Sequence, residues 1–355
     1  MSDFTLDPEQ TRHEMAQMQQ RATELLSSLA ALRDVDIGTA PKDAVYREDK
    51  LTLYRYRPAT SARTAGPAVL ICYALVNRPY MMDLQPDRSL IRGLLQQGMD
   101  VFLIDWGYPD GSDRFLELDD YVNRYLPHCA SKVCELRDEA HVNLLGVCQG
   151  GTLSLCFTAL HPELVGNLIT MITPVDFQTP DDLLSKWVQP LDVDALVAAS
   201  GNVSGDWLNA AFVSLMPFRL LSQKYVALLD IAHDRHKLEN FLRMEKWIFD
   251  SPDQPGAMFA QFVRCLYQQN QLIKGELVIG GKPVKLQSIT QPLFNVYAAQ
   301  DHLVPPAASR CLRQYVASTD YSELAFAGGH IGIYVSGKAQ RQIPAALVDW
   351  LRQRS

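Results

Sequence analysis

One short stretch, residues 144–151, constrains the fold of this chain more than any other part of the sequence. It reads Leu-Leu-Gly-Val-Cys-Gln-Gly-Gly and places Cys148 between Gly146 and Gly150. An apolar run over 142–147 precedes the cysteine, and a run compatible with a helix, 152–160, follows it. Where a strand turns sharply into a helix, side chains two residues before and after the turn would clash with neighbouring backbone. The pattern therefore predicts a strained strand-to-helix elbow that presents a nucleophile.

Such an elbow places the sulfur of Cys148 above the sheet and at the start of a helix. A helix N-terminus favours the thiolate over the thiol, which makes a cysteine there reactive. The alternative is a buried structural cysteine, the commonest state of a free cysteine. The flanking strand and helix, together with two residues much later in the chain, favour the nucleophile.

Composition narrows the class of protein. The chain has 355 residues, 47% of them hydrophobic and 21% charged, which is typical of a soluble globular protein. The net charge of −7 argues against a general nucleic-acid surface, although a local basic pocket for phosphates stays open. The longest uncharged apolar run, residues 68–76, is too short to span a bilayer, and no signal peptide is expected at the N-terminus. Seven cysteines without framework or zinc spacing predict reduced thiols in a cytoplasm.

The chain divides into three parts by pattern. Residues 1–40 form an N-terminal helical segment, whose apolar positions between 8 and 32 recur three or four apart and should pack on the main domain or on a partner. Strands alternate with helices over 41–175 and strand rhythm returns over 289–355, so these two stretches should form one α/β core. Because its strands are apolar on both faces, the core should be a mostly parallel sheet covered on both sides.

Residues 176–288 interrupt this rhythm and are predicted to be an inserted, mostly helical cap or lid. Few strand signals occur there, and turn residues separate the helical runs. The expected helices cover 181–186, 206–215, 223–230, 237–247 and 258–267.

Two further residues complete a catalytic constellation with Cys148. Asp301 follows the apolar strand 293–299, and His330 follows the strand 322–326. Nucleophile, acid and histidine in this order, each past a strand, are typical of the α/β-hydrolase fold. His330 would accept the thiol proton, and Asp301 would hold the ring and stabilise the imidazolium.

Other candidate site residues depend on the same sheet. The backbone N–H groups of Gln149 and Val76 are the expected oxyanion donors. The nearby Asn77 and Arg78 are expected rather to cap or solvate their loop.

Three histidines carry weaker signals. His302, next to Asp301, is either a supporting residue around the site or an exposed loop histidine. His233 and His236 lie near two aspartates, but their spacing favours a solvated surface over a metal site. No GxGxxG or Walker motif occurs, and neither a cofactor nor a metal is predicted.

The choice of cysteine carries chemical information. A serine that accepts an acyl group forms an ester, whereas a cysteine forms a thioester, which stays activated. Exchange with a coenzyme A thioester is then nearly balanced, and a second nucleophile can collect the acyl group. If the second nucleophile is water, the enzyme is a hydrolase. If it is an alcohol, the product is an ester. An acyl unit with its own hydroxyl would give a polyester. The elbow alone does not decide among these.

The elbow resembles that of polyhydroxyalkanoate synthases, and further stretches resemble the catalytic subunit of the class III enzymes along the whole chain. These stretches are 73–80 (Tyr-Ala-Leu-Val-Asn-Arg-Pro-Tyr), 105–109 (Asp-Trp-Gly-Tyr-Pro), 173–180 (Thr-Pro-Val-Asp-Phe-Gln-Thr-Pro), 244–247 (Met-Glu-Lys-Trp) and 328–332 (Gly-Gly-His-Ile-Gly). The chain also begins close to the catalytic part, as expected for a class III or IV subunit without the long N-terminal domain of classes I and II.

The resemblance implies that Cys148 accepts a (R)-3-hydroxyacyl group, chiefly 3-hydroxybutyryl, from coenzyme A, with His330 as its base. In this family the Asp301 position is often assigned to activating the 3-hydroxyl, and whether it acts directly or through His330 stays open. The resemblance also implies a non-catalytic E-type subunit as partner, homo-oligomers within that complex, and a cytoplasmic location at the surface of polyester granules.

Two other functions remain as alternatives. A cysteine-dependent α/β-hydrolase of the dienelactone-hydrolase kind shares the G-x-C-x-G elbow, but such chains are shorter and lack an insertion of this size. A catalytically silent granule-coating protein is disfavoured by the complete set of Cys148, Asp301 and His330.

Overall fold

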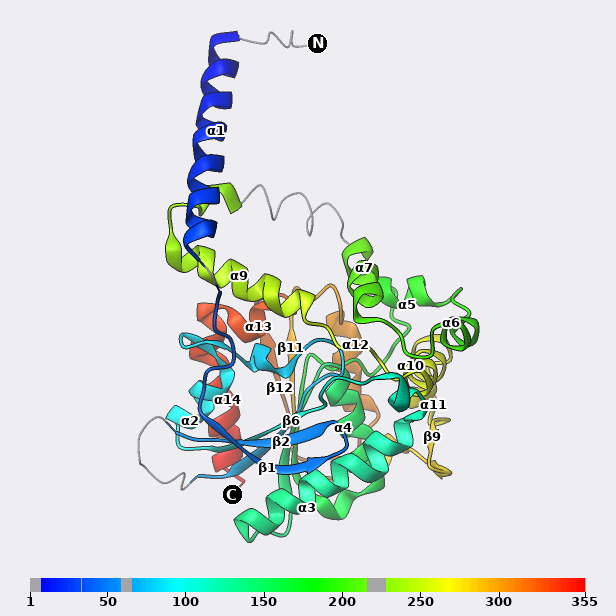
Figure 1. The fold of residues 1–355 in the computed structure, drawn as a ribbon. Helices are drawn as coiled ribbons and strands as arrows, with labels where there is room; N and C mark the ends of the chain where they lie inside the picture. The colour runs from blue at the N-terminus through cyan, green and yellow to red at the C-terminus, as the bar shows by residue number, and fades with distance from the viewer. Residues whose placement is uncertain (1–7, 33, 59–65, 216–227, 355) are drawn as a thin grey trace.

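The computed structural model describes residues 8–32, 34–58, 66–215 and 228–354. Its centre is an eight-stranded sheet in the order β1-β2-β6-β3-β7-β8-β11-β12 (Figure 1). The strands are β1 (Lys42–Glu48), β2 (Leu51–Tyr56), β3 (Ala68–Cys72), β6 (Asp100–Asp105), β7 (Val142–Val147), β8 (Val165–Met171), β11 (Leu293–Ala298) and β12 (Tyr321–Phe326). Neighbouring strands are parallel from β6 to β12. The other two pairs, β1 with β2 and β2 with β6, are antiparallel. This confirms the predicted mostly parallel sheet.

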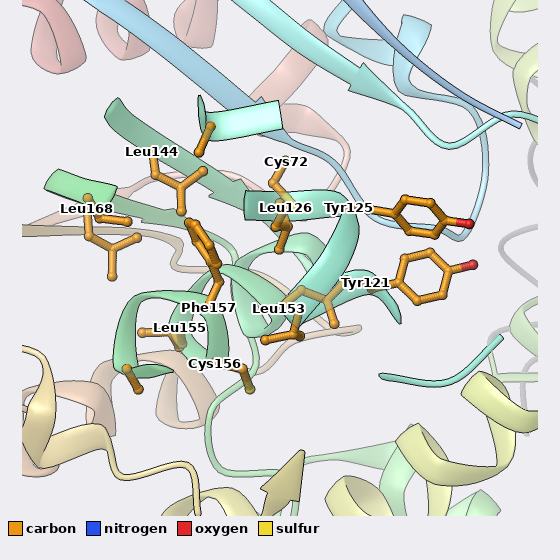
Figure 2. Close-up of a cluster of buried hydrophobic side chains, with 14 of the residues drawn as sticks. Cys72, Tyr121, Tyr125, Leu126, Leu144, Leu153, Leu155, Cys156, Phe157 and Leu168 are labelled. Carbon is orange, nitrogen blue, oxygen red and sulfur yellow. The ribbon is translucent and has the colours of Figure 1, made fainter. Parts of the chain in front are cut away.

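Helices cover both faces of the sheet. On one face lie α3 (Leu126–Arg137), which a π-helical turn over Asp120–Tyr125 precedes, and α4 (Gln149–Leu160). Figure 2 shows part of this core, where Phe157 of α4 and Leu144 of β7 lie among buried side chains. On the other face lie α2 (Leu90–Gln96), α13 (Gly332–Val335) and α14 (Gly337–Arg352). Burial on both faces explains why β3 and β7 read as apolar runs.

The stretch between β8 and β11 carries most of the remaining helices. They are α5 (Leu183–Val188), α6 (Val193–Ser200), α7 (Gly205–Leu215), α9 (Arg235–Phe249), α10 (Gly256–Gln261), a π-helical turn (Phe262–Gln268) and α11 (Gln271–Lys274). The sequence prediction missed α6 and the short hairpin of β9 (Val278–Ile279) and β10 (Lys282–Pro283). Most of the helix expected over 223–230 lies outside the described residues. The bounds of the cap, 176–288, stay a prediction.

Helix α1 (Pro8–Ala31) stands away from the rest of the molecule, and its C-terminal end lies against the start of α9 (Figure 1). Ser28 Oγ donates to the Ala232 carbonyl at 3.0 Å, and Arg21 pairs with Asp230 at 3.0 Å. Met15 and Leu26 are 67% and 68% exposed, so these two positions of the apolar stripe do not pack on the main domain, the first of the two expected alternatives. A partner for this stripe stays a prediction. None of the helices in the described ranges has the length and apolar character needed to span a bilayer.

Candidate active site

Cys148 sits at the turn between β7 and α4, as the sequence predicts. Its backbone has φ +53° and ψ −125°, a conformation that non-glycine residues rarely adopt. The Cys148 N–H donates to the Met171 carbonyl of β8 at 2.9 Å, which ties the strained residue to the next strand. Surrounding structure must hold such a conformation in place, and strained residues of this kind concentrate at functional sites.

The glycines around Cys148 have the steric role that the pattern predicts. A Cβ on Gly146 would lie 2.5 Å from Ser154 Oγ and 2.6 Å from the Cα of Gly151. A Cβ on Gly150 would overlap the carbonyl oxygens of Cys72 and Tyr73. Any side chain at either position would therefore push α4 away from the sheet.

Asp301 and His330 meet at the carboxyl edge of the same sheet. Asp301 follows β11 and His330 follows β12, and these two strands pair in parallel. His330 Nδ1 lies 2.7 Å from Asp301 Oδ2. The other carboxylate oxygen, Oδ1, accepts the N–H groups of Leu303 and Val304, both at 2.9 Å. The side chains are 8% exposed for His330 and 0% for Asp301, so the pair is shielded from water.

Three influences set the protonation of His330. Burial by itself lowers the pKa of His330, but the Asp301 carboxylate and the neighbouring Cys148 sulfur outweigh it and raise the pKa to about 10. The Asp301 carboxylate and the Cys148 sulfur thus stabilise the protonated form of the His330 ring. That is the property required of a base that takes the proton of a thiol.

Buried aromatic rings enclose the histidine. The Tyr334 ring stands edge-on to His330, with centroids 6.4 Å apart, and Tyr73 lies 6.3 Å from Tyr334. Burial raises the pKa of both tyrosines, with a further contribution from the Cys148 sulfur, so their hydroxyls stay protonated. His330 is therefore packed against buried aromatic rings that exclude water from this side of the site.

The loop after β3 runs beside the elbow. The Leu75 N–H donates to the side-chain oxygen Oε1 of Gln149 at 3.0 Å. Within the described residues, the N–H groups of Val76 and Gln149 have no hydrogen-bond acceptor. Both residues are partly exposed. Gln149 follows Cys148 in the chain, and Val76 follows Leu75, whose N–H is bonded to the Gln149 side chain. Their role as oxyanion donors stays a prediction that this geometry permits.

Arg78 holds this loop in place through its own contacts. The sequence predicts that it caps or solvates the loop. Its guanidinium donates to Asp105 Oδ2 and to the Gly107 carbonyl, both at 2.7 Å, and lies 4.0 Å from the Tyr108 ring centroid. Asn77 adopts φ +60° and donates to Ser251 Oγ at 2.5 Å. Two of the quoted sequence motifs, 73–80 and 105–109, thus meet here because they build one support.

Asp250 belongs to the same support, and sequence reasoning missed it. The hydroxyls of Tyr80 and Tyr108 each donate to a different oxygen of its carboxylate, both at 2.7 Å. Both partners lie more than a hundred residues away in the chain, and Asp250 stands in an ordinary turn sequence. No local signal marks it.

The sequence singles out three further histidines. His302 follows Asp301 and is half-buried, and its supporting role stays a prediction. His233 and His236 are exposed. In the part of the chain that the structure covers, no three His, Cys, Asp or Glu side chains are placed to hold a metal ion. All seven cysteines are free.

Comparisons with known proteins agree with this architecture. A family model described as "alpha/beta hydrolase fold" matches residues 67–336, and one described as "Poly-beta-hydroxybutyrate polymerase (PhaC) N-terminus" matches residues 11–94. The poly(3-hydroxyalkanoate) polymerase subunit PhaC of Allochromatium vinosum is 53% identical over 100% of both chains. The subunit of Thiocystis violacea is 51% identical over 100% of both chains, and that of Synechocystis is 48% identical over 98% of this chain and 94% of its own.

Solved structures share the fold at low identity. A putative non-heme bromoperoxidase BpoC from Mycobacterium tuberculosis has a TM-score of 0.50 at 15% identity, over 87% of this chain and 98% of its own. A monoacylglycerol lipase from Paleococcus ferrophilus has a TM-score of 0.50 at 16% identity, over 85% and 99%. At this identity the similarity supports the α/β-hydrolase fold alone.

Proposed function

The chain belongs to the PhaC family of poly(3-hydroxyalkanoate) polymerase subunits, which are acyltransferases, and on this premise we propose that it builds the polyester on Cys148. The substrate is a (R)-3-hydroxyacyl-coenzyme A, chiefly 3-hydroxybutyryl-coenzyme A. The observation that carries the proposal is the strained Cys148 elbow beside the buried His330–Asp301 pair.

Acylation is the first step. His330 takes the proton of the Cys148 thiol, and the sulfur then attacks the carbonyl carbon of the substrate thioester as a thiolate. The N–H groups of Val76 and Gln149 receive the negative charge that forms on the carbonyl oxygen. The bond to coenzyme A then breaks, and its sulfur takes the proton back from His330. One thioester replaces another, so atoms and charges balance.

Chain growth is the second step. The 3-hydroxyl oxygen of another acyl unit attacks the thioester carbonyl on Cys148, and His330 accepts the hydroxyl proton. An ester forms, and the Cys148 thiol is restored with that proton. Since each unit brings its own hydroxyl, the two steps repeat and the polyester lengthens.

Asp301 acts through His330 in both steps. Its Oδ2 is engaged by His330 Nδ1, its Oδ1 accepts two backbone N–H groups, and its side chain is 0% exposed. Because the carboxylate is fully buried behind the His330 ring and the Leu303–Val304 backbone, a substrate hydroxyl would have to displace part of this enclosure to reach it. We therefore assign Asp301 to orienting His330 and stabilising its imidazolium, and not to direct contact with the 3-hydroxyl.

The name "subunit" of the relatives implies that such proteins work with another chain. For this chain we propose a non-catalytic E-type subunit as partner, homo-oligomers within the complex, and a cytoplasmic location at the surface of polyester granules. Size-exclusion chromatography with light scattering, with and without the E-type subunit, tests the assembly. A chain that stays monomeric in both samples would contradict it.

The products of 3-hydroxybutyryl-coenzyme A distinguish the functions. Purified protein, alone and with the E-type subunit, should release coenzyme A and form polymer in matching amounts. Coenzyme A release with only free 3-hydroxybutyrate would instead identify a hydrolase of the dienelactone-hydrolase kind. No turnover in either sample would identify a catalytically silent protein.

A further inference from the structure

We infer that Gln254 is a positioning residue: it aims the Val76 N–H at the oxyanion through a hydrogen bond to the Leu75 carbonyl. This inference rests on the proposed function, in which Val76 donates to the oxyanion. The residues involved belong to two segments. The oxyanion loop is residues 74–78, and the bracing segment is residues 247–254, which runs from the end of α9 to just before α10.

Three side-chain hydrogen bonds join these segments. Trp247 Nε1 donates to the Arg78 carbonyl at 2.9 Å, and Asn77 Nδ2 donates to Ser251 Oγ at 2.5 Å. Gln254 Nε2 donates to the Leu75 carbonyl at 2.9 Å. The oxyanion loop is therefore held at three places by a segment that lies about 170 residues later in the chain.

The Gln254 contact differs from the other two because it holds the peptide unit between Leu75 and Val76. The Leu75 carbonyl and the Val76 N–H belong to one planar trans peptide unit, so they point in opposite directions. Fixing the direction of the carbonyl fixes the direction of the N–H. On the preceding peptide unit, the Leu75 N–H is held by Gln149 Oε1 at 3.0 Å, which ties the loop to the residue after the nucleophile.

Gln254 itself is firmly held. It is 1% exposed, and its backbone N–H and carbonyl pair with the backbone of Val203 at 2.8 and 2.9 Å. Its side-chain nitrogen faces two carbonyls, those of Leu75 and Pro252, which settles the orientation of the amide. Its Oε1 is buried without a hydrogen-bond partner in the described residues. A buried unpaired oxygen is unfavourable, so the favourable contribution of this amide comes from its donor, Nε2.

Loss of this donor should slow acylation without weakening substrate binding. A freed peptide unit can rotate, and the Val76 N–H then meets the developing charge in the wrong direction. Removing an oxyanion donor outright slows catalysis by about 100- to 1,000-fold, so misdirecting one should slow acylation by about 10- to 100-fold. The substrate concentration at half-maximal rate should change by less than about threefold, because the oxyanion contact strengthens only in the transition state.

The variants are Gln254→Met, which keeps the length without the amide, and Gln254→Glu. Gln268→Met is the matched control, because Gln268 Nε2 also donates to backbone carbonyls, those of Val188 and Leu191 at 3.0 and 2.8 Å, but not to the oxyanion loop. Coenzyme A release from 3-hydroxybutyryl-coenzyme A in a single turnover gives the acylation rate of each full-length protein.

Gln254→Met should lose about 10- to 100-fold in acylation rate, and Gln268→Met should keep the wild-type rate. Gln254→Glu should recover relative to wild type as the pH falls, because a protonated carboxyl can again donate to the Leu75 carbonyl. This recovery keeps the test valid if Gln254→Met folds poorly. A wild-type rate in Gln254→Met, equal losses in both methionine variants, or a pH-independent loss in Gln254→Glu would overturn the inference alone. No coenzyme A release from the wild type would overturn the proposed function with it.

Discussion

His330 Nδ1 lies 2.7 Å from Asp301 Oδ2, and within the described residues the other hydrogen bonds to the Asp301 carboxylate come from the backbone N–H groups of Leu303 and Val304. Both oxygens of the carboxylate are therefore engaged, and no part of the side chain is exposed. In the proposed mechanism, Asp301 therefore influences the substrate through His330. The sequence leaves open whether Asp301 acts directly or through His330. The rates of acylation and chain growth in an Asp301 variant distinguish the two roles.

Asp301→Asn should slow acylation and chain growth by the same factor, on the order of 100- to 10,000-fold, because both steps use His330. Acylation is measured as coenzyme A release in a single turnover, and chain growth as the rate at which a preformed acyl-enzyme is extended. If acylation were largely spared while growth was lost, Asp301 would instead act directly on the 3-hydroxyl.

Gly150→Ala should destabilise the protein by about 1–3 kcal/mol, because its Cβ would overlap the Cys72 and Tyr73 carbonyls. The control is Gly111→Ala, where a Cβ would meet nothing within 4 Å. Urea unfolding measures both variants. Equal stability of the two would contradict the steric role assigned to the elbow glycine.

Arg78→Met should destabilise the protein by about 3–5 kcal/mol, because it leaves Asp105 without its partner in a site where the two side chains are only 10% and 15% exposed. Arg21→Met is the matched control, since Arg21 and Asp230 are 53% and 66% exposed and their pair is worth at most about 1 kcal/mol. Thermal or urea unfolding separates the two. Similar losses would show that Arg78 is not the support of its loop.

Asp182 provides a prediction on pH. Burial raises the pKa of this carboxyl to about 6, although backbone N–H groups of α5 oppose the shift. Because the folded state then binds the proton more tightly than the unfolded state, Asp182 costs stability as the pH rises from about 4 through 6. Asp182→Asn, which keeps the N-cap bond to Ser185, should gain on the order of 1–3 kcal/mol over wild type at pH 7.5 and nothing at pH 4. A pH-independent difference in urea unfolding would contradict this.

The elbow and its sheet were predictable because their signals are local. The expected strand over 142–147 coincides with β7, and the expected order of Cys148, Asp301 and His330 follows from which residue comes after each strand. Parallel strands bring such residues to one edge of the sheet whatever lies between them in sequence. Fold and central site therefore follow from short patterns.

The support of the oxyanion loop was not predictable, because it depends on distant contacts. Asp250 and Gln254 lie about 170 residues from Tyr80 and Leu75, and a turn sequence does not show which loop it will touch. Helix α14 (Gly337–Arg352) shows a second contact that local sequence does not signal. Pro344 favours a helix break, yet the helix starts at Gly337 and Pro344 packs beside Gly93, where a Cβ would lie only 2.6 Å from its ring.

The central claim is that Cys148 carries the growing chain, and peptide mass spectrometry after a brief reaction with 3-hydroxybutyryl-coenzyme A tests it most directly. The proposed mechanism predicts one or more 3-hydroxybutyryl units on the peptide that contains Cys148, and neither adduct nor polymer in Cys148→Ala. Cys156→Ala, which removes a thiol buried in the core at 2% exposure, should keep both. Polymer formation by Cys148→Ala, or acyl units found only on another residue of the wild type, would show that Cys148 does not carry the chain.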